Sequence, residues 1–140
     1  MASLTGPGVA MFSVIAIALL MGAPQAAATS DDAFSERVQH GHMAEGAASG
    51  PGYQKQFWNK TAIALGNTYR GCIASNAGDK TPFTLVADIS PDGHPLNVEV
   101  RAPIPVAQCV AAQFSTWTFP APPKFPGSVN YPIIIDVSVK

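Results

Sequence analysis

The sequence contains little charge, few cysteines and no hydrophobic run long enough for a typical membrane span, and each shortage excludes a class of protein. Only 12% of its 140 residues are charged and the formal net charge is -1, so no basic field attracts nucleic acid or anionic lipid. Two cysteines allow one bridge, unlike the dense framework of a disulfide miniprotein. A chain of this length holds one domain, which excludes multidomain enzymes and doubly wound cofactor-binding folds.

Motifs of catalysis and of metal binding are also missing. The sequence has no G-x-S-x-G, HExxH or CxxC pattern and no glycine-rich phosphate loop, so we expect no enzymatic activity and no cofactor. His40, His42 and Met43 are suitable copper ligands but form an incomplete set, and we interpret them as chance members of a solvated segment. Asp88 and Asp92 flank a turn and do not predict a hydrolase site.

The longest apolar run, Val9 to Met21, predicts a leader. Its 13 residues span about 20 Å as a helix, short of a hydrocarbon core of about 30 Å, and small residues follow up to Ala28. This pattern indicates a signal peptide over residues 1–28, cleaved after Ala28. No Lys or Arg precedes Arg37, which is unusual for such a leader, so an uncleaved membrane anchor is the alternative.

Residues 29–52 are polar and small, with Phe34, Val38 and Met43 as the sizeable apolar side chains. They show no sustained period, and we expect a flexible linker that can be removed without unfolding the domain of residues 53–140. Export favours a bridge between Cys72 and Cys109, which we expect to be a structural staple and not a redox pair.

Hydrophobic periodicity within residues 53–140 predicts two helices and three strands. A helix of about 20 residues begins near Gln54 and ends by 76–78. Its apolar face consists of Trp58, Ala62, Leu65, Tyr69 and Cys72, widened by Phe57 and Ile73. Alternation predicts strands at 83–89, 96–101 and 129–139, with a turn at 90–93 and a helix at 106–116.

Chain direction then fixes a topology. The first two strands are antiparallel through their short turn, and the second helix reverses the chain, so the last strand pairs antiparallel with the first. We therefore expect an α+β fold of order αββαβ, with a three-stranded antiparallel sheet in the order 2-1-3 and both helices on one face. The last strand is an edge, which suits Pro132.

Several pieces of the chain together resemble a known family. Segments 89–94, 117–122 and 127–133, with Cys72 and Cys109 in the two helices, are similar to the C-terminal domain of TonB-type proteins, closest to the two-cysteine branch named after AgmX and PglI. The resemblance implies an αββαβ fold that docks periplasmic partners, including by strand addition. TonB-type transducers have a long Pro- and Lys-rich spacer, whereas about 25 residues separate the apolar run from this domain, which disfavours an energy transducer.

These observations predict a small exported, non-enzymatic periplasmic module that binds a protein or peptide in the cell envelope, or a second copy of itself. Two alternatives are a membrane-anchored envelope transducer or scaffold subunit, and a secreted inhibitor or effector. Trp117, Phe119 and Tyr131 form either an aromatic docking surface or part of the core. The expected partner-binding edge is the last strand, at Val129, Asn130, Tyr131, Ile133, Ile134 and Ile135.

Overall fold

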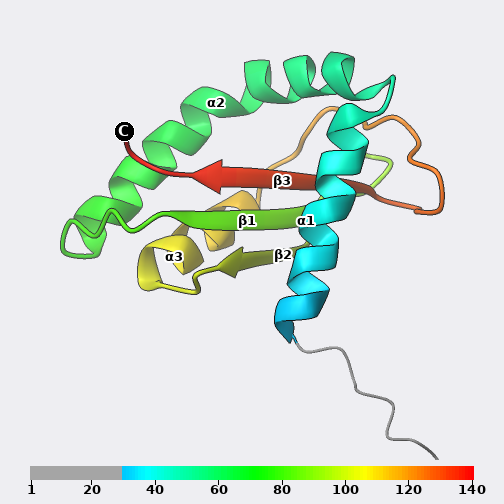
Figure 1. Ribbon diagram of the computed structural model, residues 1–140. Helices are drawn as coiled ribbons and strands as arrows, with labels where there is room; N and C mark the ends of the chain where they lie inside the picture. Colours follow the sequence, from blue (N-terminus) through cyan, green and yellow to red (C-terminus); the bar gives the residue numbers. More distant parts are fainter. Residues whose placement is uncertain (1–29) are drawn as a thin grey trace, which may run out of the picture.

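The computed structural model describes residues 30–140, and the expected leader lies outside them. Three helices and three strands follow one another along the chain (Figure 1). Their bounds are α1 (Ser30–Gly46), α2 (Gly50–Ser75), β1 (Phe83–Ile89), β2 (Pro95–Arg101), α3 (Pro105–Phe114) and β3 (Tyr131–Val137).

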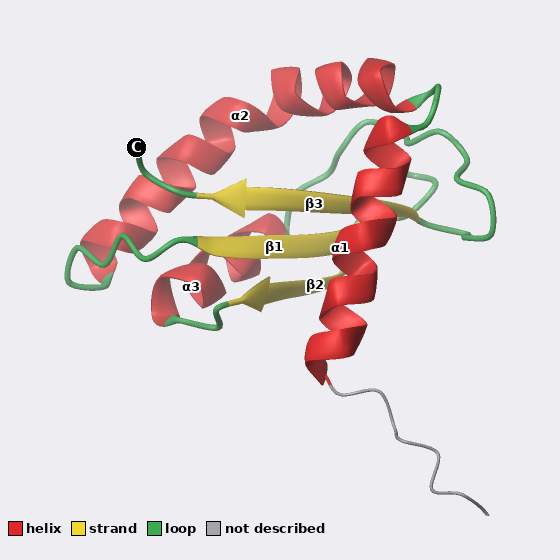
Figure 2. Ribbon diagram, viewed as in Figure 1, coloured by secondary structure: helices red, strands yellow, loops and turns green. Residues whose placement is uncertain are grey.

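The three strands form one antiparallel sheet in the order β2-β1-β3, which confirms the expected α+β fold and strand order (Figure 2). Leu85 at the centre of β1 lies opposite Ile135 on one side and Val100 on the other. The pairing of β1 with β3 is continuous, whereas β2 carries an irregularity opposite Val86–Asp88, with Asn97 at a positive φ of 51°. Both β2 and β3 are therefore edges.

The turn between β1 and β2 forms at the expected residues and also fixes a distant loop. Gly93 N donates to Ser90 O over 2.8 Å, and Gly93 has a φ of 93° that favours glycine. Phe119 N donates to Gly93 O, and a Cβ on Gly93 would lie 2.1 Å from Phe119 O. Glycine thus permits both the turn and the close approach of the loop that leads to β3.

The main core lies between the sheet and α2 with α3. The buried face of α2 differs in part from the expected one: Trp58 is 36% exposed and Ala62 is exposed, while Phe57, expected at the margin of the apolar stripe, is buried. Phe57 stacks on Phe119 at a centroid distance of 5.0 Å, and Phe119 also packs on Phe114. These ring contacts set the rotation of α2, whose buried residues after its first turn are Tyr53, Phe57, Thr61, Leu65, Tyr69 and Cys72.

The expected flexible linker is wrong, because most of residues 29–52 is helical. Helix α1 crosses the face of the sheet opposite to α2 and α3, so helices cover both faces (Figure 1). Phe34 is buried against Val86 and Ile134, two strand residues whose side chains point away from the main core, and Val38 packs beside it. The apolar surface of this second face explains why a polar segment becomes ordered there.

Helix α1 approaches the sheet closely and is held by charge as well. A Cβ built on Gly41 would lie 2.7 Å from Ile134 Cγ2, so only glycine fits without displacement. Arg37 pairs with Glu99 at 3.2 Å and with Asp88 at 3.5 Å, both on the sheet. The folded domain therefore begins at α1 and not at residue 53.

Candidate docking edge and groove

The last strand is shorter than its alternating sequence predicts. β3 begins at Tyr131, whose partner Ile89 is the final residue of β1, so pairing cannot extend further towards residue 129. Val129 and Asn130 consequently precede the strand, and the Val129 side chain is 84% exposed. Two of the six expected edge residues are therefore outside it.

The other expected edge residues direct their side chains into the protein. Tyr131, Ile133 and Ile135 belong to the main core, and Ile134 lies beneath α1. Tyr131 is closest to complete burial, and its hydroxyl donates to Ala44 O over 3.2 Å. What β3 presents at its edge is therefore main chain and not its large side chains.

Hydrogen bonding alternates along the sheet and shows which main-chain groups of β3 point outward. Ser90 N donates to His94 O over 2.8 Å, so Ser90 and, by alternation, the even-numbered residues of β1 direct their main-chain groups towards β2. Odd-numbered residues of β1 then bond β3, in pairs such as Leu85 with Ile135. The even-numbered residues of β3, Pro132, Ile134 and Asp136, direct their main-chain groups away from the sheet.

Helix α1 comes close to the middle of this edge, where a Cβ built on Gly41 would lie 3.3 Å from Ile134 N. Pro132 supplies no N–H, and Asp136 is an exposed carboxylate that accepts a hydrogen bond from Thr84 Oγ1 at 2.7 Å. Charge and proline are common protections of an edge strand, and here the N–H groups of Ile134 and Asp136 remain directed outward.

A groove lies between this edge and α2. One part, about 240 Å³, is lined by Trp58, Leu65 and Tyr69 of α2, by Ile135 to Val137 at the end of β3 and by Ser138 after it. We expected Trp58 in the core, but its side chain forms part of the wall of this groove. An adjoining hollow of about 480 Å³ shares Gly66, Tyr69 and Ser138 with the first and continues past the end of β3.

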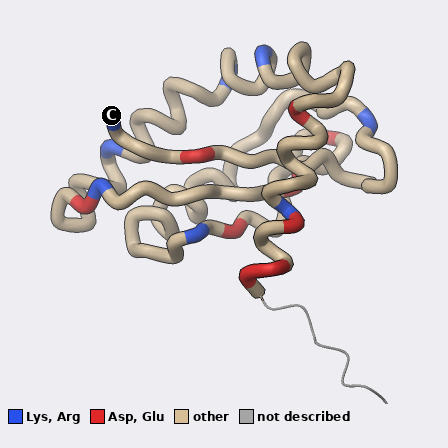
Figure 3. Tube along the Cα trace, viewed as in Figure 1, with Lys and Arg blue, Asp and Glu red and all other residues tan. Residues whose placement is uncertain are grey.

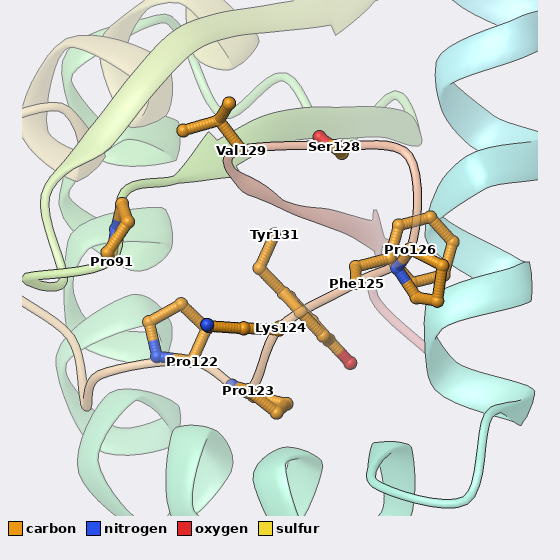
Figure 4. A pocket seen from close by; sticks show the side chains of 9 residues that line it. All are labelled: Pro91, Pro122, Pro123, Lys124, Phe125, Pro126, Ser128, Val129 and Tyr131. Atoms are coloured by element: carbon orange, nitrogen blue, oxygen red, sulfur yellow. The ribbon is translucent and has the colours of Figure 1, made fainter.

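A second, separate hollow of about 460 Å³ opens beside the loop that leads to β3 (Figure 4). Its side chains surround Tyr131 and come from the β1–β2 turn and from the proline-rich loop: Pro91, Pro122, Pro123, Lys124, Phe125, Pro126, Ser128 and Val129. It bears one cation and no other charged side chain. Tyr131 is the one residue of β3 that lines this hollow. The hollow therefore presents fewer strand main-chain groups to an extended partner than the groove between β3 and α2, which we call the β3 groove.

The three aromatic residues that we considered as a docking surface belong to the core. Phe119 and Tyr131 are buried, and Trp117 is partly buried against Phe114 at a centroid distance of 5.6 Å. The core interpretation is therefore confirmed, and the exposed aromatic ring beside the groove is Trp58 instead.

Cys72 and Cys109 form the expected disulfide, with an S–S distance of 2.08 Å and Cα atoms 5.8 Å apart. The bridge joins α2 to α3, and Cys72 is buried in the main core. Arg70 lies two residues away but is exposed and bonds Asn67 Oδ1. This setting is that of a staple between two helices.

Two tyrosine hydroxyls are the titratable groups most affected by burial. Burial, with a smaller contribution from Tyr131, raises the pKa of Tyr53, whose hydroxyl donates to Pro120 O over 2.9 Å. Burial also raises the pKa of Tyr131, together with the charge of Glu45. The two rings pack edge to face at 4.8 Å, where the ends of α1, α2 and β3 meet.

The histidines of α1 do not assemble with further ligands in residues 30–140, where no three His, Cys, Asp or Glu side chains cluster as a metal site would require. His42 Nδ1 lies 3.5 Å from Glu45 Oε2, and Met43 is exposed. In the same range, none of the helices has both the length and the apolar character needed to cross a membrane. The apolar run of the expected leader lies outside the described residues.

Comparison with known proteins gives no family for this chain, so a function is inferred from the geometry above. Neither a protein-family model, nor a curated protein, nor a solved structure matches the chain.

Proposed function

We propose that this chain is a small exported interaction module, without enzymatic activity of its own, that binds an extended segment of a protein or peptide in the cell envelope. The segment adds to the outer edge of β3 as a fourth strand. The observation that carries the proposal is the open edge: the N–H groups of Ile134 and Asp136 point outward, and a groove lies beside Asp136. The same mode is implied by the resemblance to TonB-type domains.

Strand addition suits this edge better than recognition by side chains alone. The side chains of Ile133, Ile134 and Ile135 are held in the two apolar layers of the fold, so the strand is rigid and its main chain is presented in a fixed geometry. Main-chain hydrogen bonds then supply affinity, and the groove wall at Trp58 and Leu65 selects side chains of the added strand.

Export is part of the proposal and is supported by the disulfide. Bridges of this kind persist in the periplasm or outside the cell, whereas the cytosol keeps thiols reduced. We propose that residues 1–28 are removed after Ala28. The intact mass of protein from a periplasmic extract tests this: a product that begins at Thr29 is expected, and a retained Met1 or Met11 would support the anchored alternative instead.

The docking edge is tested with a random twelve-residue peptide display library, selected on the purified full chain. Selected peptides are expected to bind Asp136→Ala, which loses the carboxylate and keeps the N–H, and to lose at least tenfold in affinity for Asp136→Pro, which loses both. Pro132 shows that an outward position of β3 accepts proline. Circular dichroism and urea unfolding establish that both variants remain folded.

Two outcomes would contradict this assignment. The first is equal binding to the two Asp136 variants. The second is a stable dimer of the wild-type chain that Asp136→Pro dissociates, as measured by light scattering, because the edge would then belong to a second copy. Val98→Pro, at the opposite edge of the sheet, serves as the control and is expected to leave peptide binding unchanged. Circular dichroism must show this variant folded, because Val98 packs on the core and follows Asn97, whose φ is positive.

A further inference from the structure

The charge of the chain is divided between its two long helices. Helix α2 carries Lys55, Lys60 and Arg70 and no acidic residue, whereas α1 carries four acidic residues and one cation. The β3 groove lies along α2, on the basic side of the molecule, and acidic positions gather on α1 across the sheet (Figure 3). The part of the groove beside β3 bears one charged side chain, the carboxylate of Asp136, so a partner meets positive charge only in the hollow past the end of the strand.

This charge is concentrated at one end of the groove. The hollow beyond the end of β3 is lined by Arg70, Lys80 and Lys140, and no acidic side chain lines it. The three cations come from α2, from the loop that precedes β1 and from the residues after β3, which meet at this hollow. None of the three forms an ion pair with another side chain among residues 30–140.

Asp79 and Asp136 are acidic residues close to this hollow along the chain or along the groove, and within the described part of the chain neither forms an ion pair with its cations. The carboxylate of Asp79, which precedes Lys80, accepts hydrogen bonds from Thr81 N and Thr81 Oγ1, and these bonds lower its pKa. Asp136 lies at the other part of the groove and accepts from Thr84 Oγ1. Among residues 30–140 the three cations are therefore not neutralised by a direct carboxylate contact.

We propose that the strand added at β3 is an acidic segment, with apolar residues beside Trp58 and Leu65 and one or more carboxylates in the hollow formed by Arg70, Lys80 and Lys140. This inference rests on the proposed strand addition and adds the chemistry of its partner. The apolar part of the groove faces the paired length of β3, and the basic hollow begins at Ser138, just after the strand ends. Carboxylates are therefore placed at one end of the segment and not along it.

Arg70, Lys80 and Lys140 line one hollow, and the planar guanidinium of Arg70 suits a carboxylate better than an ammonium group does. Because all three side chains are exposed, the attraction depends on salt and acts on the choice of partner and on association rate as well as on affinity.

The test uses charge reversal in the same peptide-display selection. The double variant Arg70→Glu with Lys80→Glu reverses two of the three charges in the hollow. The double variant Lys55→Glu with Lys60→Glu makes the same change in net charge on α2, away from the hollow. Peptides selected on the wild-type chain are expected to carry Asp or Glu at one end. We expect them to bind the Arg70/Lys80 variant about tenfold more weakly in low salt and the Lys55/Lys60 variant less than about threefold more weakly.

The difference between the two variants is expected to shrink in 0.5 M salt. Selected peptides without acidic residues, or equal effects of the two double variants, would overturn the acidic assignment while strand addition stands. Selected peptides that bind equally to Asp136→Ala and Asp136→Pro would overturn strand addition itself, so the two failures are distinguishable.

Discussion

At the scale of single residues, Gly41 decides how closely α1 approaches the sheet. We expect Gly41→Leu to lower the free energy of unfolding by about 1–3 kcal/mol, because any Cβ there meets Ile134. The matched control is Gly71→Leu on α2, where a Cβ meets nothing within 4 Å. Leucine favours the helix more than glycine does, so this substitution is expected not to lower the free energy of unfolding. Urea unfolding measures both, and an equal effect of the two substitutions would show that α1 is not packed at Gly41.

The buried tyrosines predict a stability that falls in alkali. Because burial raises the pKa of Tyr53 above its unfolded value of about 10, the folded chain resists ionisation that the unfolded chain accepts. Stability is therefore complete below pH 10 and declines as the pH rises above it. Urea midpoints at pH 8 and pH 11 measure the loss, which is expected to be smaller in Tyr53→Phe. An equal decline in the two proteins would exclude Tyr53 as the cause.

At the scale of elements, the disulfide fastens α2 to α3. Closing a loop with a sequence separation of 37 stabilises by about 4 kcal/mol through loop-closure entropy in the unfolded chain. We expect the double variant Cys72→Ala with Cys109→Ala to lose about that much in urea unfolding and to keep its peptide binding, since the bridge lies in the core and not on the outer edge of β3. Loss of binding in a variant that is still folded would assign the bridge a role at the edge.

Helix α1 is expected to contribute to stability through its few apolar contacts. Phe34→Ala removes the ring that covers Val86 and Ile134 and should cost about 2–3 kcal/mol of unfolding free energy. Met43→Ala changes an exposed side chain of the same helix and should stay within about 0.5 kcal/mol. If the two variants unfold at the same urea concentration, α1 does not stabilise the fold.

The elements that the sequence predicts well are those with a regular apolar period. The alternation of Phe83, Leu85, Ala87 and Ile89 places β1 correctly, and the turn at Gly93 requires the residue found there. Helix α1 escaped prediction because it meets the sheet through Phe34 and small residues such as Gly41, which produce no sustained apolar stripe. The acidic pair Asp31 and Asp32 in its first turn was the available signal, since carboxylates stabilise a helix N-terminus.

At the scale of the whole molecule, the sequence indicated an edge strand but not the groove beside it. An alternating run such as β3 identifies a strand, and chain direction places it at the edge. The groove depends on the rotation of α2, which exposes Trp58 and buries Phe57, and on the meeting of Arg70, Lys80 and Lys140 from separate parts of the chain. The rotation of a helix and the meeting of distant side chains arise from tertiary packing, and no short stretch of the sequence encodes them.

The two-sided covering of the sheet explains how β3 can be an open edge without being a weak strand. Its side chains are fixed between α1 on one face and α2 with α3 on the other, so its outer main-chain groups are presented by a rigid scaffold. An added strand therefore costs little ordering of the domain itself, and most of the entropy lost on binding belongs to the partner.

The central claim, that β3 offers unpaired main-chain groups to an added strand, is tested most directly by amide hydrogen exchange at single residues. In the free protein, the amide of Asp136 is expected to exchange much faster than those of Ile133 and Ile135, which bond β1. On addition of a peptide selected from the library, exchange at Ile134 and Asp136 is expected to slow markedly. A peptide that binds tightly and leaves both amides unprotected would contradict the account.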